Sequence, residues 1–144
     1  MNITYEKIDN ISDLGIRVYG ESIEKIFINV FYAICDLMIK RVKVERYLEN
    51  TVIQLAANDI EELLNKWLSE VFYFLTVKNV FLSNVCIEKL SCTVMIVKAN
   101  AQKIDVERTL IKKNIKAVAL HDLRITENKK NFCAEVCFDV LRNN

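Results

Sequence analysis

The sequence predicts a single α+β domain in which two main helices pack on a largely antiparallel β-sheet. The chain has 144 residues, of which 52% are hydrophobic. This content is enough for one compact core, and the chain is too short for two ordinary domains. Apolar residues recur at helical spacing in two stretches, whereas β-branched and aromatic residues dominate most of the remainder. We therefore treat residues 1–144 as one domain.

The N-terminal segment holds both glycines of the chain, Gly15 and Gly20. Strands are predicted at residues 4–8 and 16–19, where β-forming residues dominate. Glycine is retained where the backbone takes a positive φ or closely approaches another group, so we interpret the two glycines as turns on either side of the second strand. Asp13 then either caps a turn or is available as a ligand.

Two helices follow from periodicity and capping residues. The first is predicted to begin after an N-cap at Ser22 and to end near Lys40. Its apolar residues extend past one face, so it is either mostly buried or borders a partner. The second helix is predicted from a capping box formed by Asn58 and Glu61, and Trp67 on its apolar face is interpreted as a core anchor.

The other strands are predicted at residues 51–56, 80–87, 92–98, 116–126 and 132–141. The polar segments 88–91 and 127–130 are interpreted as hairpin connections. In the last strand Ala134, Val136 and Phe138 point to one side, and Cys133, Glu135, Cys137 and Asp139 to the other. Asp139 therefore either reaches solvent at the strand edge or has a compensating cation or hydrogen-bond donors.

Composition and charge narrow the class of protein. A formal net charge of +1 argues against a general nucleic-acid binder that relies on bulk charge. The apolar run 26–39 is shorter than the roughly 20 residues that cross a bilayer, and the N-terminus shows no export leader, so a soluble cytoplasmic protein is expected. The five cysteines form no C-x-x-C pair and are interpreted as reduced core residues.

Two carboxylates near opposite ends of the chain are the main candidates for chemistry. If the fold brought Asp13 and Asp139 together, they would suit a hard divalent cation, and calcium would need further oxygens from backbone and water. Whether the two residues meet is left open at this point. His121, the only histidine, lies beside alanine and leucine and is interpreted from its neighbours as structural, because no nucleophile motif accompanies it.

Residues 5–20, YEKIDNISDLGIRVYG, resemble the opening motif of the archease family, which has the form YE-x-x-x-HTADIGI-x-x-x-G. Asp13 occupies the aspartate position of that motif. Further segments match the family in order at residues 22–27, 59–70, 115–123 and 138–140. The resemblance spans nearly the whole chain and implies an archease-like fold.

Archeases assist the RNA ligase of the RtcB type, which joins 3′-phosphate or cyclic-phosphate RNA ends to 5′-hydroxyl ends in tRNA splicing and RNA repair. The resemblance therefore implies a protein cofactor and not an enzyme. Such a protein promotes guanylylation and repeated turnover of the ligase, and meets RNA only through it. No membrane partner is expected, and the oligomeric state is not indicated.

The resemblance also implies site residues. A metal site would be formed by Asp13, Asp139 and the neighbouring Val140, the last through its backbone carbonyl. Calcium is the expected ion, with magnesium or manganese as alternatives. Lys116 matches a lysine of functional importance in the family, and His121 is retained, so both are assigned to activation of the partner.

The chain departs from the family pattern at three places. Asn10 and Ile11 replace the histidine and threonine of the motif, and Ala119 and Leu120 replace a usual Thr-Tyr pair. Residues 141–144 extend beyond the usual end at Asp-Ile or Asp-Val.

Two other functions are weighed against ligase activation. A small metal-dependent hydrolase or nuclease could use the same acidic pair, although two-metal phosphoryl chemistry usually needs more clustered ligands. A chaperone-like interaction module would account for the unusually apolar first helix.

Overall fold

The protein is described by a computed structural model that covers residues 5–8, 14–111, 115–118, 123–129 and 131–140. Contacts between Cα atoms divide the chain into two compact units. Unit 1 combines residues 1–38 with 112–144, and unit 2 is the continuous segment 39–111. The prediction of one domain over residues 1–144 stays a prediction.

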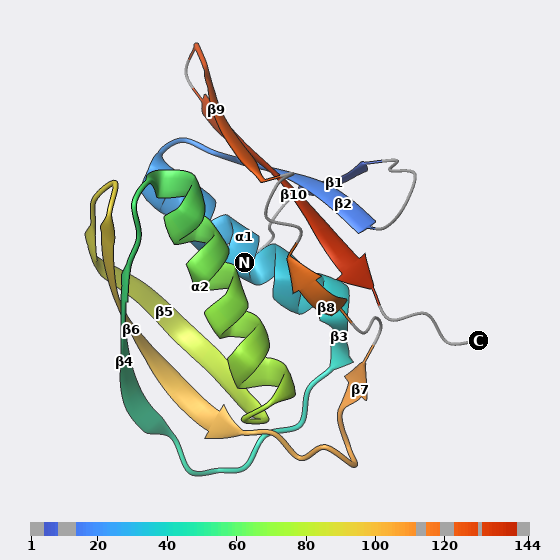
Figure 1. Cartoon of the computed structure of the whole chain (residues 1–144). Coiled ribbons are helices and arrows are strands. Elements are labelled where there is room, and N and C mark those ends of the chain that lie inside the picture. Colours follow the sequence, from blue (N-terminus) through green and yellow to red (C-terminus); the bar gives the residue numbers. More distant parts are fainter. Residues whose placement is uncertain (1–4, 9–13, 112–114, 119–122, 130, 141–144) are drawn as a thin grey trace. The chain divides into compact units, whose positions relative to one another are not determined.

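Unit 1 contains one helix and an antiparallel sheet (Figure 1). Its elements are β1 (Tyr5–Ile8), β2 (Leu14–Gly20), α1 (Ile23–Met38), β8 (Ile115–Val118), β9 (Arg124–Asn128) and β10 (Asn131–Val140). The strand order is β1-β2-β10-β8, and β9 also pairs with β10. The predicted single strand over 116–126 is therefore wrong, because β8 and β9 pair with different halves of β10.

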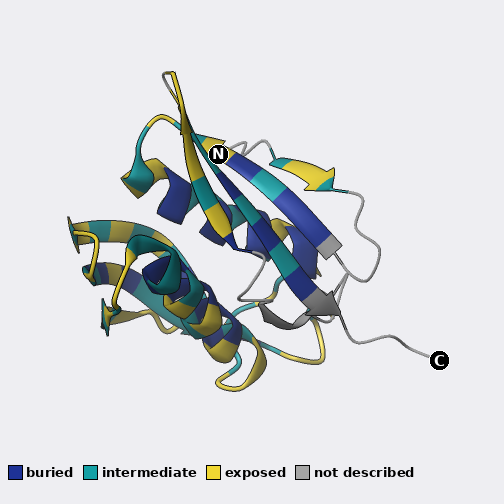
Figure 2. Ribbon diagram, turned by 45° about the horizontal axis from the view of Figure 1, so that its top comes forward, coloured by how far each residue is buried: buried dark blue, intermediate teal, exposed yellow. Residues whose placement is uncertain are grey.

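The core of unit 1 lies between α1 and one face of the sheet. Ile16 and Val18 of β2 and Ala134, Val136 and Phe138 of β10 are each 0% exposed. α1 packs on both strands and buries its wide apolar surface, as predicted for a mostly buried helix. Figure 2 shows the accompanying alternation of buried and half-buried residues along β10.

Ser22 caps α1 as predicted. Its hydroxyl oxygen accepts a hydrogen bond from the Lys25 backbone N–H at 3.1 Å, and its carbonyl accepts from the Ile26 N–H at 3.0 Å. These bonds satisfy N–H groups that have no partner within the first turn, which fixes where the helix begins.

Both glycines lie inside β2, and neither has a positive φ. The prediction that they form turns flanking a shorter strand is therefore wrong. Close approach explains them: a Cβ at Gly15 would lie 3.3 Å from the Ile8 Cβ, and one at Gly20 would lie 3.0 Å from the Ile26 nitrogen. Each glycine leaves space for a neighbouring element to approach the strand.

Unit 2 contains the second helix and further antiparallel strands. Its elements are β3 (Ile39–Arg41), β4 (Glu49–Ala56), α2 (Ile60–Thr76), β5 (Val80–Leu90), β6 (Val94–Lys103) and β7 (Leu110–Ile111). The strands form a sheet of order β4-β6-β5 and a separate β3-β7 pair. α2 packs on β4 and β5, and Trp67 is 0% exposed, so its interpretation as a core anchor is confirmed.

The capping box of α2 is shifted by one residue from its predicted position. Asp59, not Asn58, is the N-cap, and its Oδ1 accepts from the Glu62 N–H at 2.8 Å. Glu62 in turn accepts from the Asn58 N–H at 3.3 Å. Both Asn and Asp are good N-caps, and the adjacent Glu61 and Glu62 allow either register in the sequence.

Together the two units confirm the predicted α+β class, with two main helices and antiparallel sheets. The hairpin connection predicted at 88–91 lies at residues 91–93, where Ser91 and Val94 exchange hydrogen bonds. Cys86 and Cys92 are exposed, so their assignment to the core is wrong. Within the described part of the chain, no helix is long and apolar enough to span a membrane.

Candidate functional site

The register of β10 brings the two ends of the chain into neighbouring strands. Leu14, which directly follows Asp13, is the Cα partner of Phe138, which directly precedes Asp139. On the other side of β10, Asp139 is the partner of Ala117 in β8. Asp13 lies outside the described residues, and for Asp139 and Val140 only the backbone is described, so their predicted role as metal ligands stays a prediction.

A bulge interrupts the pairing of β8 with this end of β10. Asp139 pairs with Ala117, whereas Val140 pairs with Ile115, so Lys116 is the extra residue on β8. β-Bulges redirect side chains and are frequent beside functional sites. The side chain of Lys116 is not among those described, and His121 lies outside the described residues, so the assignment of both to the partner stays a prediction.

A row of charged side chains crosses the outer face of the same sheet. Arg17 donates to Glu135 Oε1 from Nε at 3.1 Å and forms an ion pair with the same oxygen from Nη2 at 3.0 Å. Its Nη1 lies 3.3 Å from Glu6 Oε2. The hydrogen bond to Glu135, followed by that to Tyr19, raises the pKa of Arg17 above its ordinary value. The row ties β1, β2 and β10 together.

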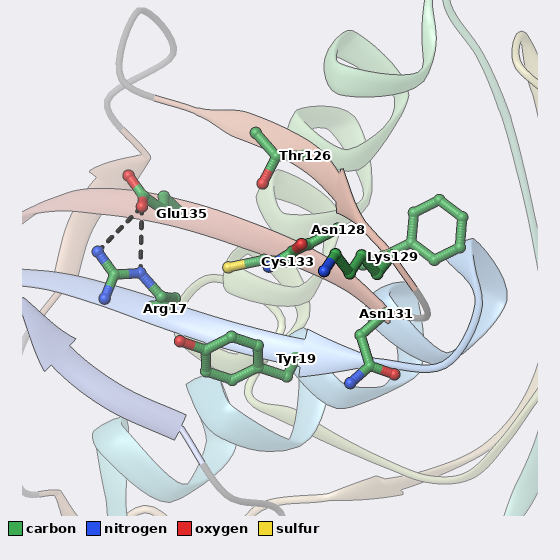
Figure 3. A pocket seen from close by; sticks show the side chains of 9 residues that line it. Arg17, Tyr19, Thr126, Asn128, Lys129, Asn131, Cys133 and Glu135 are labelled. Carbon is green, nitrogen blue, oxygen red and sulfur yellow. Dashed lines mark hydrogen bonds and ion pairs between the residues drawn. The ribbon is translucent and has the colours of Figure 1, made fainter.

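Beside this row the outer face is hollowed into an open concavity of about 560 Å³ (Figure 3). The Arg17–Glu135 pair lies at one end, and Lys129 and Asn131 at the other, with Tyr19 and Cys133 between them. Partial burial raises the pKa of the Cys133 thiol, which reduces its reactivity as a nucleophile.

The sequence predictions did not include this outer-face surface. Arg17 and Tyr19 of β2 are far along the chain from Glu135 of β10. Only the register of β2 against β10 reveals that they are neighbours. Alternation along the last strand placed Cys133 and Glu135 on one face, but it carries no information about the partner strand. Among the described residues, no group of three or more His, Cys, Asp or Glu side chains could hold a metal ion.

These features define an α+β protein in which β2 pairs with the last strand, β10, so that the residues next to Asp13 and Asp139 lie at one end of the sheet. The archease protein family (MTH1598/TM1083) matches residues 5–140, and the chain belongs to that family. The family resemblance noted in the sequence is therefore confirmed.

Individual relatives agree with this assignment. The protein archease of Pyrococcus furiosus is 28% identical over 124 residues, which cover 84% of this chain and 87% of the relative. The protein archease of Pyrococcus abyssi is 31% identical over the same length and with the same coverage.

Two solved structures share the fold. The solution structure of protein 1598 of Methanobacterium thermoautotrophicum has a TM-score of 0.67 and 23% identity, covering 94% of this chain and 97% of that one. The crystal structure of an archease of Thermotoga maritima, described as a possible chaperone, has a TM-score of 0.66 and 15% identity, covering 93% and 95%.

Proposed function

We propose that the protein is a non-enzymatic activator of an RtcB-type RNA ligase, which promotes guanylylation and repeated turnover of the ligase in tRNA splicing or RNA repair. Membership of the archease family over residues 5–140 is the observation that carries this proposal. The matched region includes both the opening motif around Asp13 and the terminal residues Asp139 and Val140.

A divalent cation, calcium first, would be held by Asp13, Asp139 and the carbonyl of Val140. Two facts support this part of the proposal. The donors are all oxygens, which hard cations prefer. The pairing of Leu14 with Phe138 also puts the chain neighbours of the two aspartates on adjacent strands.

Lys116 and His121 would contact the ligase or a phosphate beside this cation. The bulge opposite Asp139 and Val140 supports the choice of Lys116, because an extra residue changes the direction of side chains in a strand. The roles of both residues rest on the family resemblance.

The test is ligation of 3′-phosphate RNA by the cognate ligase in limiting amount, with and without this protein. We expect faster ligase guanylylation and more than one ligation per ligase molecule. The protein alone, with RNA and calcium, magnesium or manganese, should leave the RNA intact. Unchanged guanylylation and turnover would reject the activator, and metal-dependent RNA cleavage by the protein alone would favour the hydrolase.

The metal ligands are tested with Asp139→Ala and a control, Asp105→Asn, in unit 2. Asp139→Ala should abolish stimulation and calcium binding measured by isothermal titration calorimetry, with little change in circular dichroism. Asp105 forms a largely exposed ion pair with Arg108, so its substitution should leave both readouts unchanged. Full calcium binding in Asp139→Ala would contradict the proposed site.

A chaperone-like interaction module is the second candidate. The description of the Thermotoga maritima archease as a possible chaperone favours it. Exposed apolar side chains in unit 2, including Tyr47 at 71% and Val52 at 53%, offer contact surface. The apolar surface of α1 no longer supports this function, because that surface is buried. Suppression of client aggregation without metal and without ligase would favour this candidate.

A further inference from the structure

The concavity on the outer face of the unit 1 sheet is separate from the proposed metal site. It lies over the first half of β10, around Asn131 and Cys133, whereas Asp139 is near the other end of that strand. At about 3.3 Å per residue, Cys133 and Asp139 are roughly 20 Å apart along the strand. A ligand in the concavity would therefore not displace the proposed cation.

Three polar side chains in the concavity have unused hydrogen-bonding capacity. Thr126, Asn128 and Asn131 are exposed and make no side-chain hydrogen bond to any residue that the structure describes. Each asparagine amide can both donate and accept, and the threonine hydroxyl can do the same. The surface can therefore match a ligand whose edge carries donors and acceptors together.

An aromatic ring stands beside these amides in a fixed position. Tyr19 is 41% exposed, and its hydroxyl donates to Glu6 Oε2 at 3.3 Å. Its backbone carbonyl accepts from the Asn29 side chain at 2.8 Å. A tyrosine whose hydroxyl and backbone are both hydrogen-bonded loses little entropy when a flat group stacks on its ring.

Charged side chains of both signs surround the concavity. Arg17 is paired with two carboxylates, Glu6 and Glu135, so the end that it occupies offers no free cation. Lys129 makes no ion pair with a described residue, so its positive charge is available. A second concavity of about 410 Å³ shares Tyr19 and Asn131 with the first and adds Lys25 and Glu21. Lys25 and Lys129 therefore both lie near Asn131, beside the Tyr19 ring.

We propose that this surface binds a short segment of single-stranded nucleic acid. One base would stack on Tyr19, its polar edge would meet Asn128 and Asn131, and neighbouring phosphates would approach Lys129 and Lys25. Stacking on aromatic residues combined with backbone cations is the general basis of such binding. This direct contact goes beyond the proposed function, in which RNA is met through the ligase, and it does not rest on it.

The test is fluorescence anisotropy of a labelled ten-nucleotide single-stranded RNA titrated with the full chain, without ligase. With two cations involved, the slope of log K against log salt should be about −1.4. Lys129→Gln should weaken binding and reduce the slope by about 0.7, whereas Lys89→Gln, an exposed lysine of unit 2, should change neither.

Aromatic stacking is tested with Tyr19→Ala and Tyr19→Phe. The alanine variant should bind at least about fivefold more weakly, while the phenylalanine variant keeps the ring and most of the affinity. Circular dichroism confirms that both are folded. As a check on wild-type protein, RNA should slow alkylation of Cys133 and leave that of the exposed Cys86 and Cys92 unchanged.

Three results would overturn the proposal: no RNA binding at millimolar protein, binding that Tyr19→Ala and Lys129→Gln both leave unchanged, or binding of an oligosaccharide but not of RNA. Because no ligase is present, these results leave the activator proposal untouched. Conversely, a failed ligation assay would not affect the RNA-binding result.

Discussion

Arg17 has two glutamates as partners because β2 lies between β1 and β10. Glu6 is its Cα partner on β1, and Glu135 is its partner on β10. Without the arginine, two carboxylates would face each other across β2. A single side chain therefore links three strands on the outer face of unit 1.

We predict that Arg17→Gln lowers the midpoint of urea unfolding only slightly at low salt, because the side chains involved are 35% to 55% exposed and partly screened by solvent. Urea unfolding at low and at about 1 M salt measures this, and the loss should shrink at high salt. Arg108→Gln, from a more exposed pair, is the control and should have little effect. A loss that is independent of salt would contradict the electrostatic explanation.

The two glycines should tolerate alanine differently. In Gly20→Ala the new Cβ would lie 3.0 Å from the Ile26 nitrogen and 3.1 Å from the Lys25 Cβ, so the first turn of α1 would have to move. We expect a loss of about 1–3 kcal/mol in unfolding free energy. In Gly15→Ala the nearest atom is the Ile8 Cβ at 3.3 Å, on the short edge strand β1.

A small shift of β1 can relieve the Gly15→Ala contact, and alanine also reduces the entropy of the unfolded chain. Gly15→Ala should therefore be nearly neutral in urea unfolding. Equal losses for the two variants would show that close approach does not distinguish the two positions.

Tyr5 makes the free energy of unfolding depend on pH in the alkaline range. Its hydroxyl donates to Asp36 Oδ2 at 2.6 Å, and burial followed by this hydrogen bond raises the pKa of Tyr5 to about 12, against an ordinary value of 10.0. The folded state therefore favours the protonated phenol. Its contribution to stability is fully present below pH 10 and is lost as the pH rises towards 12.

We predict that Tyr5→Phe is less stable than wild type at pH 7 and that the difference narrows between pH 10 and 12, as measured by urea unfolding. Absorbance at 295 nm should show one phenol titrating near pH 12 that is missing in the variant. Asp36→Asn should lower the pKa of Tyr5 by removing the negative charge. A difference that is constant with pH would contradict this coupling.

At the scale of the elements, two neighbouring residues, Asn58 and Asp59, are candidates for the N-cap of α2. Asp59 accepts from Glu62, whereas the side chain of Asn58 has no hydrogen bond to a described residue. We predict that Asp59→Ala lowers the free energy of unfolding by about 1 kcal/mol and that Asn58→Ala changes it by much less. Thermal unfolding followed by circular dichroism distinguishes them, and the reverse order would restore Asn58 as the cap.

Periodicity predicted the elements wherever one side of an element is buried. The alternation of Ala134, Val136 and Phe138 and the helical spacing around Trp67 both follow from a solvent-facing and a core-facing side. The split into β8 and β9 was not predicted, because β-propensity does not say which half of β10 a strand joins. β3 and β7 were missed because segments of 3 and 2 residues carry no periodicity.

The proposed metal site comes from residue chemistry together with the family motif, and it stays a prediction. Residue chemistry alone selected Asp13 and Asp139 as a possible pair, and the register that makes Leu14 and Phe138 partners was not contained in either segment. The outer-face surface around Tyr19 was not predicted, since its residues are brought together by pairing between strands more than a hundred positions apart.

At the scale of the whole molecule, the two units differ in how the chain forms them. Unit 2 is continuous from 39 to 111, whereas unit 1 needs β2 and β10 to meet across the intervening chain. Long-range pairing is slow because loop-closure entropy must be lost first. In unit 2 Ile39 is the partner of Ile111, so a folded unit 2 holds the two connections to unit 1 side by side.

We therefore predict that unit 2 folds first. In pulse-labelled hydrogen exchange during refolding, the amides of Met95 and Val97 in β6 should become protected before those of Ala134 and Val136 in β10. Leu68→Ala, which leaves a cavity under α2, should delay protection in both units, because β10 can pair readily only after unit 2 has brought the connections together. Ala134→Gly should delay only β10. Earlier protection of β10 would show that β2 and β10 pair without help from unit 2. An equal delay of both strands in Ala134→Gly would also contradict the proposed order, because unit 2 would then depend on β10.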